Sequence, residues 1–118
     1  MRRVVALGVA LIALVSVGLI YSKLAQARRE TAYRAAVEPY QRDLPVGMPR
    51  ADVEKYLASR HVEYHAASYR EGYTTYELKI GEDPGNLVCE AWQVYIALEF
   101  NSSDKLAEVH IRKTGTCL

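Results

Sequence analysis

The chain has 118 residues, with 15 Lys and Arg, 14 Asp and Glu and two cysteines, so it has room for one domain. Residues 1–38 carry six basic and two acidic side chains, whereas residues 39–118 carry nine basic and twelve acidic ones. A nucleic-acid-binding domain needs a basic surface, so the mildly acidic second part of the chain argues against that class. No motif has the spacing of a catalytic, cofactor or metal site, and we therefore expect a protein that is not an enzyme and has no cofactor.

An uncharged apolar segment extends from Val4 to Ser22. As a helix it would be about 28 Å long, close to the roughly 30 Å hydrocarbon core of a bilayer. It is apolar on every side, whereas the core helix of a soluble protein has a polar stripe. We therefore predict a transmembrane or signal-anchor helix over residues 4–22, preceded by a cytoplasmic segment of residues 1–3.

The segment after the apolar helix allows two interpretations. Ala25-Gln26-Ala27 has the small-x-small form of a signal-peptide cleavage site, but the apolar segment is longer than the usual signal-peptide core of about 7–15 residues. The tract from Lys23 to Val37 is rich in alanine and charged residues and has no helix breaker before Pro39. We favour an uncleaved anchor with a helical stalk and linker over residues 23–46; cleavage after Ala27 is the alternative.

Residues 47–118 predict a small α+β domain, in which a short helix packs on a four-stranded antiparallel sheet. The short helix follows from Pro49 near its first turn and from Val53, Tyr56 and Leu57 at i, i+3, i+4 spacing. Alternation of apolar and polar residues predicts the strands, and clusters of turn formers separate them. The predicted strands are 62–69, 73–81, 93–101 and 106–113, with a turn at 82–86.

The last two predicted strands form a hairpin that brings the cysteines together. Matching their apolar faces pairs Leu98 with Val109 and Ile96 with Ile111, or shifts this register by two residues. The first register places Cys117 opposite Glu90, one residue from Cys89. We therefore predict a Cys89–Cys117 disulfide. Two alternatives are two unrelated buried thiols and a zinc site that adds one of the histidines, His61, His65 or His110.

A disulfide implies an oxidising compartment. We therefore expect a single-pass protein of the inner (cytoplasmic) membrane with its C-terminal domain in the periplasm. The positive-inside rule alone favours the opposite orientation, because more basic residues follow the apolar segment than precede it. These residues are Arg2 and Arg3 before the segment and Lys23, Arg28, Arg29 and Arg34 after it.

The pattern Gly47-Met48-x4-Val53-x3-Leu57, and later Val94 to Phe100 followed by Leu106-x2-Val109, resembles the small outer-membrane assembly lipoproteins of the SmpA/OmlA (BamE-like) group. The resemblance covers roughly residues 44–112 and implies a compact domain that binds a partner without catalysis. The lipid-bearing cysteine of that group is absent, and Leu57-Ala58-Ser59-Arg60 stands in place of its Leu-Gly-x-Pro. The resemblance therefore concerns the fold, and it assigns no functional residue.

Nine tyrosines against one phenylalanine allow two interpretations. They fill the core and rim of a thin sheet, or some of them form a recognition surface, since tyrosine suits contacts that are half apolar and half wet. We predict a membrane-anchored, periplasm-facing interaction or accessory domain of the cell envelope with an unidentified protein partner. The alternative is a secreted inhibitor-like or ligand-binding domain released by cleavage after Ala27. The candidate recognition surface consists of Tyr64, Tyr69, Tyr73, Tyr76 and Tyr95. Glu77, Glu99 and Glu108 are expected to be solvated on outward strand faces.

Overall fold

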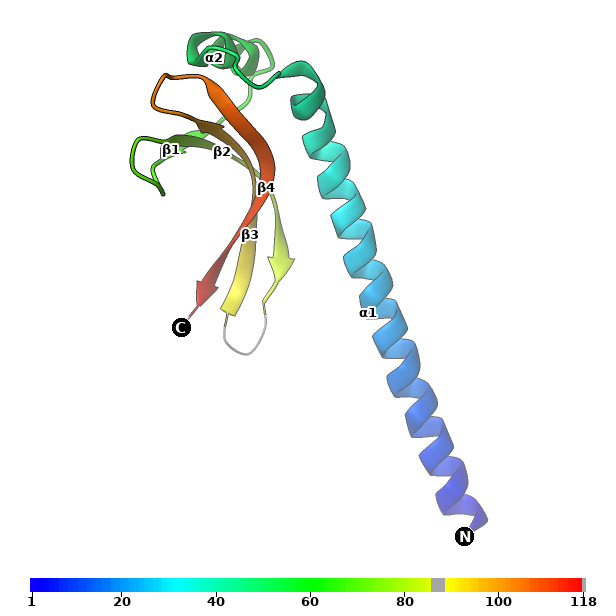
Figure 1. Ribbon diagram of the computed structural model, residues 1–118. Helices are drawn as coiled ribbons and strands as arrows, with labels where there is room; N and C mark the ends of the chain where they lie inside the picture. The colour runs from blue at the N-terminus through cyan, green and yellow to red at the C-terminus, as the bar shows by residue number, and fades with distance from the viewer. Residues whose placement is uncertain (86–88, 118) are drawn as a thin grey trace. The chain divides into compact units, whose positions relative to one another are not determined.

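The computed structural model of the protein describes residues 1–85 and 89–117, and only the backbone of residues 89–90 and 116–117. The elements are α1 (Arg2–Asp43), α2 (Arg50–Ser59), β1 (His65–Ala67), β2 (Thr74–Pro84), β3 (Cys89–Phe100) and β4 (Leu106–Cys117) (Figure 1). The strands form one antiparallel sheet in the order β1-β2-β3-β4. The predicted α+β class, with a long apolar helix, a short helix and a four-stranded sheet, is confirmed.

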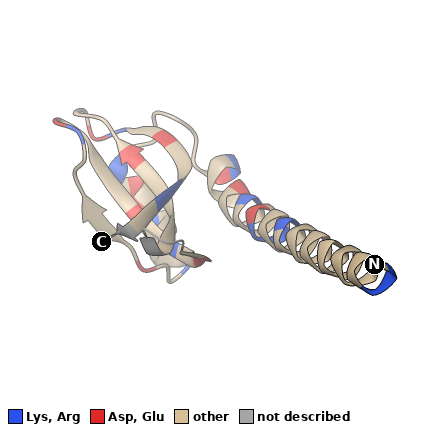
Figure 2. Ribbon diagram, turned by 90° about the horizontal axis from the view of Figure 1, so that it is seen from below, with Lys and Arg blue, Asp and Glu red and all other residues tan. Residues whose placement is uncertain are grey.

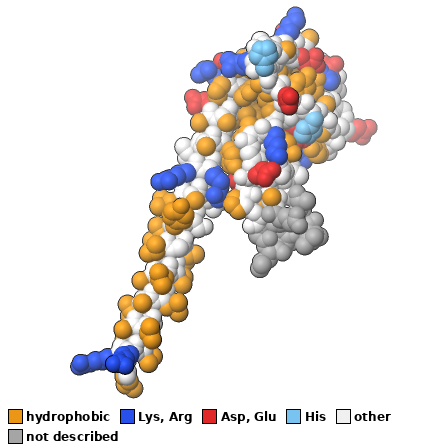
Figure 3. All heavy atoms as spheres, turned by 180° about the vertical axis from the view of Figure 1, so that it is seen from behind, with side chains coloured by type: hydrophobic (Ala, Val, Ile, Leu, Met, Phe, Trp, Pro, Cys, Tyr) orange, Lys and Arg blue, Asp and Glu red, His pale blue; other side chains and the backbone are white. Residues whose placement is uncertain are grey.

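The chain divides into two compact units, residues 1–32 and residues 33–118. The first unit is helical, and its side chains between Arg3 and Lys23 carry no charge, as the uniformly tan stretch in Figure 2 shows. Apolar side chains cover this stretch in Figure 3, and its large ones, from Val4 to Leu24, are exposed. By length and composition, α1 is therefore able to cross a membrane.

Helix α1 continues past the helix breaker Pro39 and ends at Asp43. A proline inside a helix removes a hydrogen bond and costs about 3 kcal/mol. Burial offsets this cost, since Val37 and Leu44, on either side of Pro39, are 5% and 2% exposed in the core. For the same reason the second unit begins at Tyr33, earlier than the start that we predicted at Gly47.

The predicted short helix is present as α2, and a histidine in the left-handed conformation ends it. His61 has a φ of 55°, and its N–H donates to the carbonyl of Ala58 at 3.1 Å. The N–H of Val62 donates to the carbonyl of Leu57 at 3.1 Å. This pair of bonds is the Schellman arrangement, in which glycine is the usual residue at the left-handed position.

Replacing His61 with glycine is expected to stabilise the domain by about 0.5–1 kcal/mol, because glycine adopts positive φ without the steric cost that other residues bear. Urea denaturation of wild type and His61→Gly measures the difference. The matched control is Ser59→Gly within α2, which should be destabilising. Equal losses in both variants would show that the left-handed conformation of residue 61 does not limit stability.

Strand β2 extends into the turn predicted at residues 82–86, so that prediction is wrong for residues 82–84, and residue 86 lies outside the described residues. Beyond Glu77, β2 has no pairing with β1, so the N–H that Pro84 lacks is not needed for a ladder on that side. A register irregularity falls between Lys79 and Gly81. A Cβ at Gly81 would lie 3.0 Å from the Tyr33 ring, so glycine here lets α1 pack closely on the strand.

The hairpin register is confirmed where its apolar faces meet: Ile96 pairs with Ile111, and Leu98 with Val109. A second irregularity lies between Cys89 and Ala91, where the ladder shifts by one residue. Cys117 therefore pairs with Cys89 itself and not with Glu90. The disulfide itself lies outside the described residues, because only the backbone of the two cysteines is described.

One face of the sheet forms the core together with the end of α1 and with α2. Its buried side chains come from every element except β1 and include Leu57 of α2 and Phe100 of β3. Because side chains alternate along a strand, the residues between them lie on the opposite face. We call this opposite side the open face; its residues are Thr75, Glu77 and Lys79 of β2, Tyr95, Ala97 and Glu99 of β3, and Glu108, His110 and Arg112 of β4.

Candidate functional site

The open face has three rows of residues that face one another across the strands. Lys79, Tyr95 and Arg112 form one row, and His65, Glu77, Ala97 and His110 form the next. The third row contains Ala67, Thr75, Glu99 and Glu108. The face therefore has a basic and aromatic side, a central row with two histidines, and an acidic side.

A buried carboxylate lies in the central row. Glu77 is 1% exposed, so our prediction that this side chain is solvated is wrong. Burial of a carboxylate is costly unless donors satisfy it. Tyr69, from the segment after β1, donates its hydroxyl to Oε1 of Glu77, and Nε2 of His65 lies 3.7 Å from the same oxygen. The tyrosine and the histidine therefore cover Glu77 and are positioned by it.

Two further aromatic contacts order the side chains around Glu77. The guanidinium of Arg112 lies 3.4 Å from the centroid of the Tyr69 ring, a cation–π contact. The His65 ring meets the Tyr95 ring edge to face, with their centroids 5.5 Å apart. The result is a contiguous cluster of aromatic and basic side chains on the open face. We call Tyr69, Tyr95, His65 and Arg112, together with Glu77, the open-face cluster.

The five predicted surface tyrosines are therefore divided between the two faces. Tyr69 and Tyr95 belong to the open-face cluster, and the Tyr73 ring lies 3.5 Å from the Arg70 guanidinium, which bonds Glu99 of the open face. Tyr76 is a core residue at 2% exposure, so its assignment to an exposed surface is wrong. Tyr64 stacks on Tyr76 at 4.5 Å, away from the open face.

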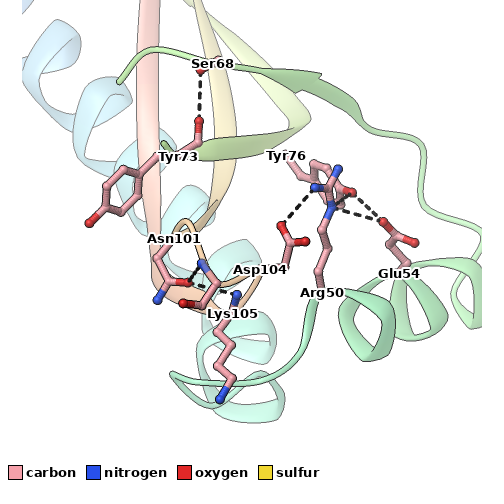
Figure 4. Close-up of polar contacts among 9 residues, drawn as sticks. Arg50, Glu54, Ser68, Tyr73, Tyr76, Asn101, Asp104 and Lys105 are labelled. Atoms are coloured by element: carbon pink, nitrogen blue, oxygen red, sulfur yellow. Dashed lines mark hydrogen bonds and ion pairs between the residues drawn. The ribbon is translucent and has the colours of Figure 1, made fainter. Parts of the chain in front are cut away.

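Tyr76 also holds a polar network that joins α2 to the turn between β3 and β4 (Figure 4). Its hydroxyl lies 2.5 Å from Nε of Arg50 and donates to Glu54 at 2.6 Å. Arg50 also reaches Asp104 at 3.4 Å. Part of this network lines a hollow of 440 Å³, together with Pro49, Ala51, Ser103 and Lys105. Because its charged groups satisfy one another, we interpret this network as a structural connection and not as the functional site.

No family model, curated protein or solved structure matches this chain. Sequence reasoning missed the role of Glu77, because a glutamate that alternates with apolar residues is typical of a solvated strand face. The signal that could have revealed this role is Tyr69, an aromatic residue in the segment just before that strand, whose side chain could cover Glu77.

Alkaline pH is expected to destabilise the domain. The hydrogen bond to Glu77, then burial, raises the pKa of Tyr69; burial, then a carboxylate acceptor, raises the pKa of Tyr56 and of Tyr76. Since the folded state holds these protons more tightly, their stabilisation is complete below pH about 10, the pKa of a free tyrosine, and is lost as pH rises through the raised values. Urea midpoints measured between pH 8 and 11 should fall above pH about 10.

Tyr69→Phe is the matched variant for this measurement, because it removes one titrating hydroxyl and keeps the ring. Its midpoint should fall less steeply with pH than that of wild type. A wild-type midpoint that stays constant up to pH 11 would contradict the proposed linkage.

Proposed function

We propose that the protein is a membrane-anchored, periplasm-facing interaction domain of the cell envelope that binds a protein partner through its open face and has no catalytic activity. The observation that carries the proposal is the open-face cluster. Tyrosine and arginine are enriched in the buried centres of protein interfaces, where they contribute most of the binding energy. Here they lie together on the side of the sheet opposite the helices.

The side chains of this cluster are held in place by one another, which also favours binding. Glu77 holds Tyr69, and Tyr69 in turn supports Arg112. Side chains that are fixed before binding lose less conformational entropy when a partner covers them. The acidic and basic sides of the same face would give that partner a defined orientation, since charge complementarity selects register.

The membrane part of the proposal rests on the portion of α1 in the first unit, which exposes its large apolar side chains from Val4 to Leu24. We place this helix in the inner (cytoplasmic) membrane as an uncleaved single-pass anchor. A core helix of a soluble protein buries its apolar side chains, whereas this stretch is wholly unburied. An apolar helix of this length is stable in a bilayer because its backbone groups are satisfied internally.

The cysteine register supports the periplasmic orientation. Directly paired residues of antiparallel strands have Cα atoms about 4.5–5.5 Å apart, within the range that a disulfide spans. Cys89 and Cys117 are such a pair. We propose that they form a disulfide, which requires an oxidising compartment and therefore outweighs the charge bias around the apolar segment.

One observation favours the alternative of a released, secreted domain. The compact unit begins at Tyr33, so cleavage after Ala27 would leave all of it intact. The mature N-terminus distinguishes the two forms. We expect the anchored form to keep the apolar segment, and a protein that begins at Arg28 would contradict the anchor.

Photo-crosslinking in intact cells tests the binding face. A photoreactive phenylalanine analogue at Tyr69, which is 53% exposed, should yield a discrete adduct with one protein. The matched control is the same analogue at Lys55, an exposed residue of α2, which should yield none. Substitution of Arg112 with alanine should reduce the Tyr69 adduct. Equal adducts at the two positions, or none at Tyr69, would contradict the proposed face.

A further inference from the structure

We propose that Glu99, Glu108 and His110 form a binding site for a divalent metal ion of the Zn²⁺ class on the acidic side of the open face. One ligand atom from each of the three side chains lies within 4.8 Å of the other two. The inference does not depend on the proposed protein partner, because it concerns only these residues and the cation.

The sheet brings the three side chains together. Glu99 of β3 and Glu108 of β4 are directly paired, and His110 lies two residues beyond Glu108 on the same strand. Residues two apart on a strand share a face and are about 6.6–7 Å apart along it, so all three side chains extend to the same side. Three ligands on two paired strands are held with little freedom, which lowers the entropic cost of binding a cation.

The carboxylates form a like-charge pair. Two acids directly opposite each other in an antiparallel pair destabilise it. Arg70 compensates part of this repulsion, since its Nη2 lies 2.9 Å from Oε1 of Glu99. Glu108 is 63% exposed, and Nδ1 of His110 lies 3.6 Å from its Oε1. A cation between the two carboxylates would remove the remaining repulsion.

The histidine supplies an independent observation. The Nδ1 atom of His110 is shielded from solvent, although the side chain as a whole is 36% exposed, and it has no hydrogen-bond partner among the described residues. The 3.6 Å that separates it from Oε1 of Glu108 is too long for a hydrogen bond. A buried ring nitrogen without a partner is costly, and a metal ion shared with the carboxylates would satisfy it.

The ligand types select the class of metal ion. Carboxylates alone favour Ca²⁺ and Mg²⁺, whereas an imidazole nitrogen with carboxylate oxygens suits Zn²⁺ and related ions. Three protein ligands leave one position of a tetrahedral Zn²⁺ for water or an external ligand.

Calorimetric titration of the untagged full-length protein in detergent with Zn²⁺ tests the site. We expect one Zn²⁺ per chain, with at least tenfold weaker binding in His110→Asn and in Glu108→Gln. The matched control is His61→Asn, which removes an exposed histidine at the end of α2 outside the open face and should leave the affinity unchanged. Absence of binding in wild type, or equal weakening by His61→Asn, would overturn the proposal.

Glu99→Gln gives a readout that a merely structural role would not produce. With Zn²⁺ present, the wild-type unfolding temperature should rise and that of Glu99→Gln should not. A Zn²⁺-induced rise of the same size in both proteins would overturn the assignment of Glu99 as a ligand. This comparison of unfolding temperatures still tests the site if His110→Asn fails to fold.

Discussion

Reduction of the protein is expected to lower its free energy of unfolding by about 3.5 kcal/mol, the value that chain entropy gives for a closed loop of roughly 30 residues. The physical reason is that the proposed Cys89–Cys117 bridge restricts the unfolded chain, while the hairpin register already places the two residues opposite each other. Since small domains are stable by only about 5–15 kcal/mol, the loss is large. Urea denaturation with and without a thiol reductant measures it.

The double variant Cys89→Ser, Cys117→Ser is the matched control for reduction. It should have the stability of the reduced wild type and should not respond to the reductant. A wild-type protein that unfolds at the same urea concentration in both conditions would contradict the bridge.

Replacing Phe100 with alanine is expected to cost about 3–5 kcal/mol, the usual range for a large aromatic residue of the core. Phe100 is 0% exposed and meets the Tyr76 ring edge to face, with their centroids 4.9 Å apart. The variant loses buried area and this aromatic contact, and it leaves a cavity beside the Arg50 network.

Val46→Ala is the control for the core variant, because Val46 is 76% exposed and its truncation should change stability by less than about 0.5 kcal/mol. Thermal or urea unfolding of the three proteins gives the comparison. A loss below about 1 kcal/mol in Phe100→Ala would contradict the position of this residue at the centre of the core.

Much of the fold was predictable because the strands of the hairpin alternate clearly. Val94, Ile96 and Leu98 are buried on one face, and this pattern restricted the pairing to two registers, of which the structure has the one that pairs Ile96 with Ile111. The prediction was wrong by one residue at the cysteines because the irregularity between Cys89 and Ala91 leaves no mark in the hydrophobic pattern.

Helix boundaries were less predictable because tertiary contacts override local signals. Pro39 is a strong breaker in isolation, yet α1 passes through it since Val37 and Leu44 are buried on the sheet. The same applies to Pro84, which lies in the part of β2 beyond Glu77 that has no pairing with β1. Local propensity identifies residues that disfavour a helix or strand, and the free energy of tertiary packing decides whether the element forms there nonetheless.

The candidate site was the least predictable part of the molecule. Of the predicted surface tyrosines, Tyr69 and Tyr95 lie on the open face, whereas Tyr76 belongs to the core. The alternation of residues in β2 becomes informative only once β1 and β3 are paired with it. In the sequence, each of the proposed metal ligands is an ordinary polar or charged residue of a strand. Their convergence depends on the register that pairs Glu99 with Glu108.

The central claim is that the domain faces the periplasm with its cysteines bridged. Labelling of intact cells with a membrane-impermeant maleimide, before and after treatment with an impermeant reductant, tests it most directly. We predict no labelling of Cys89 or Cys117 before reduction and labelling of both afterwards. Labelling without reductant would contradict the bridge, and labelling only after the membrane is broken would contradict the orientation.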